Sequence, residues 1–177
     1  MNIYIDGLPV GQRNTFHFRR RFQEWLVLRQ NDLLITNHFE FNNQLEFTDK
    51  INQILLLPIT DKNCTITICC HGGPTGLRVN NETEVILWHV IVPLFHQIKN
   101  RFPNIIIILA VCEGASIETV NQSIPFVFGF TYKISLKLAL ETSSLIVVQH
   151  ITKVPLENIL LNARQYVKDN EELIKLI

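Results

Sequence analysis

The sequence carries no net charge, because 16 lysine and arginine residues balance 16 aspartate and glutamate residues. A protein that binds nucleic acid or an anionic membrane by general electrostatic attraction needs an excess of positive charge. The run Arg19-Arg20-Arg21 is short, and on an expected helix it is more typical of a solvated face. We therefore expect neither nucleic acid nor a membrane as a partner, and we expect recognition to depend on a local site.

The sequence also lacks a long hydrophobic run. No apolar stretch approaches the roughly 18 residues that a membrane-spanning helix needs. The start, MNIYIDGLPVG, lacks the basic and long apolar regions of a signal peptide. With 177 residues, 47% of them hydrophobic, the chain is long enough to bury a core without disulfides or metals. The chain has no internal repeat or linker, so we expect one domain, residues 1–177. Without a spanning run or the features of a signal peptide, we expect it in the cytoplasm.

Cysteine pairs with the spacing of structural zinc sites are missing as well. Three of the 4 cysteines, Cys64, Cys69 and Cys70, lie along one expected strand that ends before His71. Successive side chains of a strand point to opposite faces, so these thiols cannot readily pair or converge on a metal. We interpret them as reduced, buried structural residues and expect neither a metal nor another cofactor.

Short apolar runs alternate with segments of helical periodicity. The expected strands are at residues 3–5, 33–39, 64–70, 104–111 and 125–130, with a hairpin of 76–79 and 85–87 around Asn80-Asn81. The expected helices are at 16–30, 45–57, 88–102, 116–122 and 135–149, with one or two more in 155–177. Pro93 suits its helix only near the first turn, and Pro155 suits a first helical position. This order predicts an α/β fold, a three-layer αβα sandwich around a mostly parallel sheet.

Two expected strands end in reactive side chains. His71-Gly72-Gly73 follows one, and Cys112-Glu113-Gly114 follows the other. Ligands bind beyond the carboxyl ends of strands in open α/β sheets, so the imidazole and the thiol meet if the strands are neighbours. A thiol attacks a carbonyl carbon when a base and a nearby helix N-terminus favour the thiolate. The layout therefore predicts a cysteine hydrolase.

In such a site His71 handles the proton, and the backbone N–H groups of Gly72 and Cys112 form an oxyanion hole. Glycine after the histidine lets the backbone approach the substrate closely. The sequence Gly-Gly-Pro is also common in flexible turns, and that interpretation stays open. The His-Gly-Gly sequence is shared with some α/β-hydrolase esterases, but their G-x-S-x-G nucleophile elbow is missing here.

A strand with His-Gly followed by a strand with Cys-Glu-Gly resembles the caspase-hemoglobinase fold peptidases of clan CD, which include caspases, gingipains, separases and bacterial CHAT domains. The resemblance covers roughly residues 64–149 and implies a caspase-like fold. By resemblance His71 is the catalytic histidine, Cys112 the nucleophile, and the amides of Gly72 and Cys112 the oxyanion donors. The implied activity is that of a cysteine endopeptidase that cleaves a protein or peptide, in bacterial signalling or anti-phage defence.

Further positions correspond more loosely to the same family. Trp88 and its helix match the crossover helix, and Phe126 to Tyr132 match the next strand and pocket loop. The resemblance therefore makes Phe130 and Tyr132 candidate pocket residues.

The sequence departs from the family pattern near the thiol. Val111 replaces the usual alanine before Cys112, Gly114 comes sooner than in the commoner CHAT pattern, and no caspase pentapeptide is present. A second interpretation therefore stays open, in which the chain is a catalytically inactive, caspase-like module that binds a regulatory protein partner.

Charged residues near the two motifs leave the substrate preference open. Glu113 is suited to bind a basic substrate side chain, to orient the dyad or, the role we favour, to stabilise a helix start. Arg78 and Lys133 are instead suited to an acidic substrate side chain.

Overall fold

The computed structural model describes residues 1–59, 63–79, 82–120, 124–167 and 174–177. Six strands form a central sheet in the order β2-β1-β3-β7-β8-β9, and three short strands form a second sheet in the order β4-β5-β6. The central strands are β1 (Asn2–Asp6), β2 (Asn37–Glu40), β3 (Cys64–Cys69), β7 (Ile105–Ala110), β8 (Val127–Phe130) and β9 (Ile174–Leu176). The short strands are β4 (His71–Gly73), β5 (Gly76–Val79) and β6 (Glu84–Leu87).

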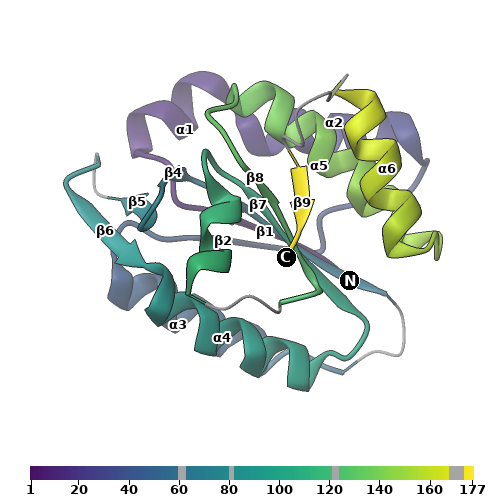
Figure 1. Cartoon of the computed structure of the whole chain (residues 1–177). Helices are drawn as coiled ribbons and strands as arrows, with labels where there is room; N and C mark the ends of the chain where they lie inside the picture. The colour runs from purple at the N-terminus through teal and green to yellow at the C-terminus, as the bar shows by residue number, and fades with distance from the viewer. Residues whose placement is uncertain (60–62, 80–81, 121–123, 168–173) are drawn as a thin grey trace.

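Helices cover both faces of the central sheet (Figure 1). The helices are α1 (Val10–Phe16), α2 (Phe18–Arg29), α3 (Gln44–Leu55), α4 (Trp88–Arg101), α5 (Leu136–Ile151) and α6 (Leu156–Tyr166). Apolar residues of α3 and α4 form one core with the sheet, and those of α2, α5 and α6 form another on the opposite face. The predicted three-layer α/β architecture with a mostly parallel sheet is confirmed.

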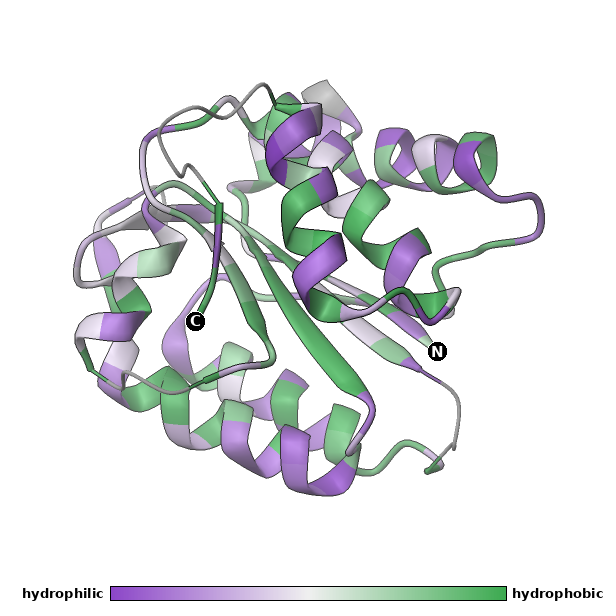
Figure 2. Cartoon of the chain, turned by 45° about the vertical axis from the view of Figure 1, so that its right-hand side comes forward, coloured by the Kyte–Doolittle hydropathy of each residue, from purple (hydrophilic) through white to green (hydrophobic). Residues whose placement is uncertain are grey.

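Strand β7 explains why the sheet is buried on both sides. Ile105, Ile107 and Leu109 pack in the core beneath α3 and α4, whereas Ile106 and Ile108 pack in the opposite core. Figure 2 shows a long strand in the middle of the sheet as continuously hydrophobic, while the helices alternate between polar and apolar residues. A continuous apolar run is the expected pattern for a parallel strand covered by helices.

The predicted hairpin is confirmed, because β5 and β6 pair antiparallel. Its turn, Asn80-Asn81, lies outside the described residues. The segment His71–Gly73, predicted as a turn, instead forms β4 and pairs with β5. His71 is therefore held in a sheet and does not lie in a flexible loop.

The C-terminal prediction is wrong in part. Residues 155–177 were expected to be helical, but in the described part of this range the helix is limited to Leu156–Tyr166, with Pro155 at its N-cap. Ile174–Leu176 forms β9, which runs antiparallel to β8 at the edge of the sheet. Three residues are too few to show a strand periodicity, and only the pairing with β8 identifies this segment as a strand.

Smaller differences concern the ends and the type of individual elements. Strand β2 begins at Asn37, four residues later than predicted. The short helix expected at 116–122 is a 3₁₀ helix, η1, at Gly114–Thr119. Pro93 is the sixth residue of α4 and lies beyond the first turn where we expected it, so the helix lacks the backbone hydrogen bond that this position would otherwise donate.

A buried ion pair fixes α1 to the end of β1. Arg13 Nε lies 3.5 Å from Asp6 Oδ1, and only 9% and 5% of the two side chains are exposed. The Arg13 guanidinium also donates to Glu40 Oε2 at 2.9 Å and to the carbonyl oxygen of Phe41 at 2.8 Å. Burial nevertheless raises the pKa of Asp6 to about 6, because the lost hydration outweighs the attraction of Arg13.

The pKa of Asp6 predicts a pH dependence of stability. Since the folded state binds the proton more tightly than the unfolded state, Asp6 stabilises the fold below about pH 4 and loses this contribution as the pH rises through about 6. Asp6→Asn cannot ionise. We therefore expect its free energy of unfolding, relative to the wild type, to increase by about 1–3 kcal/mol between pH 4 and pH 7.

Urea unfolding followed by circular dichroism at several pH values measures this difference. Asp49→Asn, at an exposed position of α3, controls for the substitution itself. A difference between Asp6→Asn and the wild type that stays constant with pH contradicts the prediction.

Candidate active site

His71 and Cys112 follow neighbouring parallel strands. Strand β3 pairs with β7, and Cys69 lies opposite Ala110 at the end of the ladder. Each reactive residue comes two positions after this last pair. The two strands are neighbours, which is the condition that the cysteine-hydrolase interpretation set, and the imidazole and the thiol lie beyond the same edge of the sheet.

The two segments beyond the strands are in direct contact. A Cβ atom on Gly72 would collide with the carbonyl oxygen of Cys112 and approach Val111 Cβ to 3.0 Å. Because a backbone oxygen cannot swing away as a long side chain can, only glycine fits at this position. We expected Gly72 to let the backbone approach the substrate closely. In the structure, Gly72 lets the backbone approach the carbonyl oxygen of Cys112.

A cavity of about 200 Å³ lies between the two reactive side chains. Its lining consists of Cys70, His71, Ala110, Val111, Cys112, Ile134, Leu136 and Ala139. Apart from His71 and the two cysteines, the lining side chains are aliphatic. The carboxyl ends of β3 and β7 thus open onto a small, mostly apolar hollow.

Cys112 differs from the other thiols in its exposure. All four cysteines are free, and Cys64, Cys69 and Cys70 are buried whereas Cys112 is partly exposed. Burial raises the pKa of each buried thiol, which keeps it protonated and unreactive. Cys70 also donates to the carbonyl oxygens of Gly7 and Arg78 at 3.5 and 3.1 Å. Cys112 is therefore the thiol that a substrate can reach.

Both ring nitrogens of His71 have other partners than the thiol. Nε2 lies 2.9 Å from Gln12 Oε1, and Nδ1 lies 3.7 Å from Glu82 Oε1. Cys112 Sγ lies 3.5 Å from the carbonyl oxygen of Ile134, to which it donates. A direct hydrogen bond between His71 and Cys112 requires rotation of these side chains.

Sequence reasoning missed Gln12 and Glu82. Gln12 precedes His71 by 59 residues and lies on α1, a helix whose position depends on the pair between Asp6 and Arg13. Neither residue belongs to a motif, and their contacts come from tertiary packing. The end of β1, where Asp6-Gly7 precedes α1, was the one signal that could have directed attention to this segment.

The two predicted oxyanion donors are the backbone N–H groups of Gly72 and Cys112, and the pairing of the strands bears on the first of them. Gly73 and Gly76 close a two-residue turn, and the pair that closes such a turn is hydrogen-bonded. Since hydrogen-bonded and other pairs alternate, we infer that the N–H of Gly72 points away from β5, at the free edge of β4. Within the described part of the chain, the N–H of Cys112 donates to no backbone oxygen. Neither N–H group is therefore used in a backbone hydrogen bond that the structure describes.

The five candidate pocket residues do not converge on the cavity. Phe130 is 2% exposed and packs in the core beneath α5. Tyr132 is 56% exposed and lines a separate hollow of about 310 Å³ next to η1. Arg78 is exposed on β5 opposite His71, and Lys133 is also exposed. Glu113 precedes η1 in a left-handed conformation, φ 55°, and makes no capping hydrogen bond through its side chain.

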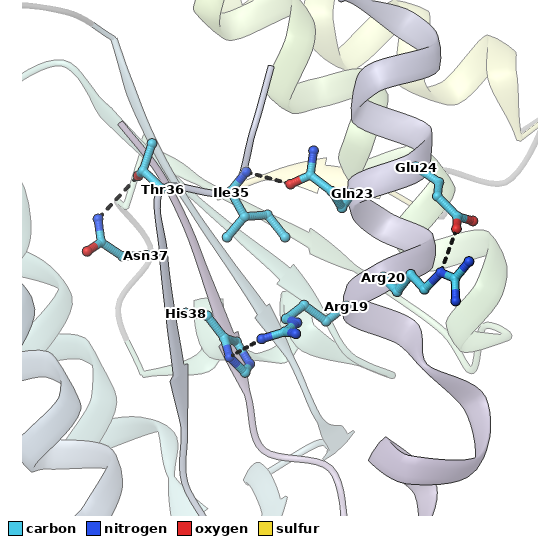
Figure 3. A pocket seen from close by; sticks show the side chains of 8 residues that line it. All are labelled: Arg19, Arg20, Gln23, Glu24, Ile35, Thr36, Asn37 and His38. Carbon is cyan, nitrogen blue, oxygen red and sulfur yellow. Dashed lines mark hydrogen bonds and ion pairs between the residues drawn. The ribbon is translucent and has the colours of Figure 1, made fainter. Parts of the chain in front are cut away.

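A larger hollow of about 640 Å³ lies between α2 and β2 (Figure 3). Arg19 donates to His38 Nδ1 at 3.0 Å, and Arg20 pairs with Glu24 at 2.9 Å. Burial, followed by the Arg19 guanidinium, lowers the pKa of His38. Two residues of the arginine run therefore have partners within the protein, and the hollow has no thiol in its lining.

Two further observations apply to the residues that the structure describes. None of their helices has the length and hydrophobicity needed to cross a bilayer. They also contain no group of three or more histidine, cysteine or acidic side chains arranged to hold a metal ion.

The sequence was compared with protein-family models and with curated proteins. No protein-family model matches the chain, and no curated protein sequence matches it significantly. The geometry of the site and the resemblance of its two short motifs are therefore the grounds on which a function can be inferred.

Two glycines that differ in the space around them should respond in opposite ways to replacement by alanine. We expect Gly72→Ala to lower the free energy of unfolding by about 1–3 kcal/mol, because its new methyl group meets the backbone of Cys112. Gly11→Ala, on α1 with nothing within 4 Å of its new methyl group, should raise it by about 0.5–1 kcal/mol. Urea unfolding of both variants measures the effects. Equal stability of Gly72→Ala and the wild type would show that the two segments do not touch in this way.

Proposed function

We propose that this chain is a caspase-like cysteine endopeptidase that cleaves a protein or peptide with Cys112 as nucleophile and His71 as proton carrier. One observation carries the proposal: the two side chains follow paired ends of neighbouring parallel strands and line one cavity. A cytoplasmic location belongs to the same proposal. A role in bacterial signalling or anti-phage defence belongs to it as well and rests on the resemblance.

The proposed reaction proceeds through a thioester. The Cys112 thiolate attacks the carbonyl carbon of the scissile bond, and the amides of Gly72 and Cys112 stabilise the oxyanion. The C–N bond then breaks as His71 donates a proton to the departing amine, which leaves the acyl group on Sγ. Water attacks the thioester with His71 as base, releases the carboxylic acid and restores the thiol.

Catalysis through this pair needs an exchange of hydrogen bonds. His71 Nε2 must leave Gln12 and turn to Cys112, whose Sγ must leave the carbonyl oxygen of Ile134. Hydrogen bonds of catalytic groups are often long or misaligned before substrate binds. Glu82, 3.7 Å from Nδ1, is placed to orient the ring as the third group of a catalytic triad does.

The same contacts favour a second candidate function. His71 and Cys112 each interact with another group, which is also what an inactive binding or regulatory module with this fold requires. In that case Gln12 and Glu82 hold the histidine as a structural residue, and the chain acts by binding a regulatory protein.

Removal of either reactive side chain should impair peptide cleavage. We expect Cys112→Ala to abolish peptide cleavage and labelling by a peptidyl acyloxymethyl ketone. His71→Ala should lower kcat/KM by about 100-fold to 10,000-fold, the usual contribution of general acid–base catalysis. Peptide cleavage assays and mass spectrometry of the labelled protein measure these effects.

Matched controls separate chemistry from folding. Cys64→Ala removes a buried thiol at the opposite end of β3, and His89→Ala removes an exposed histidine of α4. Both should keep near wild-type activity. If iodoacetamide alkylates Cys112 in the folded protein but no peptidyl probe reacts, the endopeptidase proposal is overturned and the binding module is favoured.

A further inference from the structure

We propose that the cavity beside Cys112 selects an aliphatic side chain, that of the substrate residue whose carbonyl carbon the thiol attacks. The inference rests on the proposed endopeptidase function and specifies its substrate class. Sequence reasoning left the preference open between basic and acidic side chains.

The position of the cavity identifies the substrate residue that fills it. His71 and Cys112 both belong to its lining, so a carbonyl carbon within reach of Sγ brings the side chain of the same residue to the opening. The cavity measures about 200 Å³, which is smaller than the roughly 300–1,000 Å³ of sites for whole small molecules. One side chain is an occupant of suitable size.

The lining determines the chemistry of that side chain. Ile134 and Leu136 are partly buried and supply the larger aliphatic groups, whereas Ala110 and Ala139 are fully buried and supply small ones. Small side chains at buried positions leave the depth that a leucine or methionine side chain needs. The mostly aliphatic surface around the occupant favours an apolar group.

Apart from the reactive His71 and Cys112, no side chain of the lining is suited to pair with a charged substrate side chain. Glu113, Arg78 and Lys133, the charged residues considered for recognition, are absent from its lining. The side chain of Cys70 is engaged by the carbonyl oxygens of Gly7 and Arg78. An aspartate or arginine side chain in the cavity would lose its hydration without a compensating ion pair, which is strongly unfavourable.

The test uses acyloxymethyl ketone peptides that differ only in their last residue, which is leucine, methionine, phenylalanine, aspartate or arginine. The rate constant for labelling of Cys112 should be at least about 100-fold higher with leucine or methionine than with aspartate or arginine. Equal or faster labelling by a charged probe overturns the inference but leaves the endopeptidase proposal intact. Absence of labelling by every peptidyl probe, with normal alkylation by iodoacetamide, overturns the endopeptidase proposal and the inference with it.

A pair of variants tests whether this cavity makes the selection. Leu136→Lys adds a positive charge to the lining, whereas Leu138→Lys makes the same change two residues later on α5, outside the lining. The ratio of the leucine rate to the aspartate rate should fall at least about 10-fold in Leu136→Lys. It should keep its wild-type value in Leu138→Lys. An equal effect of both variants overturns the inference.

Two further measurements test the inference if Leu136→Lys does not fold or if the protein has no turnover. If Leu136→Lys fails to fold, Leu136→Ala enlarges the cavity and should raise the ratio of the phenylalanine rate to the leucine rate about 10-fold. In Cys112→Ala, a cleavage product that ends in leucine should shift the methyl resonances of Ile134 and Leu136, and one that ends in aspartate should not. Shifts of equal size with both products contradict the inference without any need for turnover.

Discussion

The parallel pairing of β3 with β7 is the constraint on which the rest of the site depends. Six residues of each strand are paired in register, from Cys64 with Ile105 to Cys69 with Ala110. The ladder brings together two segments that are distant in the sequence, and burial of β7 on both faces prevents the register from slipping. The positions of His71, Cys112 and the cavity between them all follow from this pairing.

A second set of contacts connects the site to the N-terminal part of the chain. The ion pair of Asp6 with Arg13 orients α1, and α1 carries Gln12 to the imidazole of His71. On the other side of the ring, Glu82 approaches from the segment between β5 and β6. The conformation of His71 thus depends on two elements that do not belong to the central sheet.

The sequence predicted the framework of the fold better than the surroundings of the reactive groups. The isoleucine run of β7 was sufficient to predict a strand buried on both faces, because burial is visible in the sequence. The adjacency of β3 and β7 was only the condition on which the cysteine-hydrolase interpretation depended. The contacts of Gln12 and Glu82 were not visible, because they depend on tertiary packing. The segment Phe126 to Tyr132 was correctly associated with β8. The resemblance made Phe130 and Tyr132 candidate pocket residues, but Phe130 faces the core and Tyr132 lines a different hollow.

The contact of Gly72 with the carbonyl oxygen of Cys112 has a consequence for how the chain tolerates change. Here main chain meets main chain, with the side chain of Val111 beside it, so this contact depends little on the shape of the other core side chains. Aliphatic residues in the two cores are free to exchange for others of similar volume while this contact persists. Most substitutions in the core should therefore change the geometry of the site little, as long as residue 72 remains a glycine.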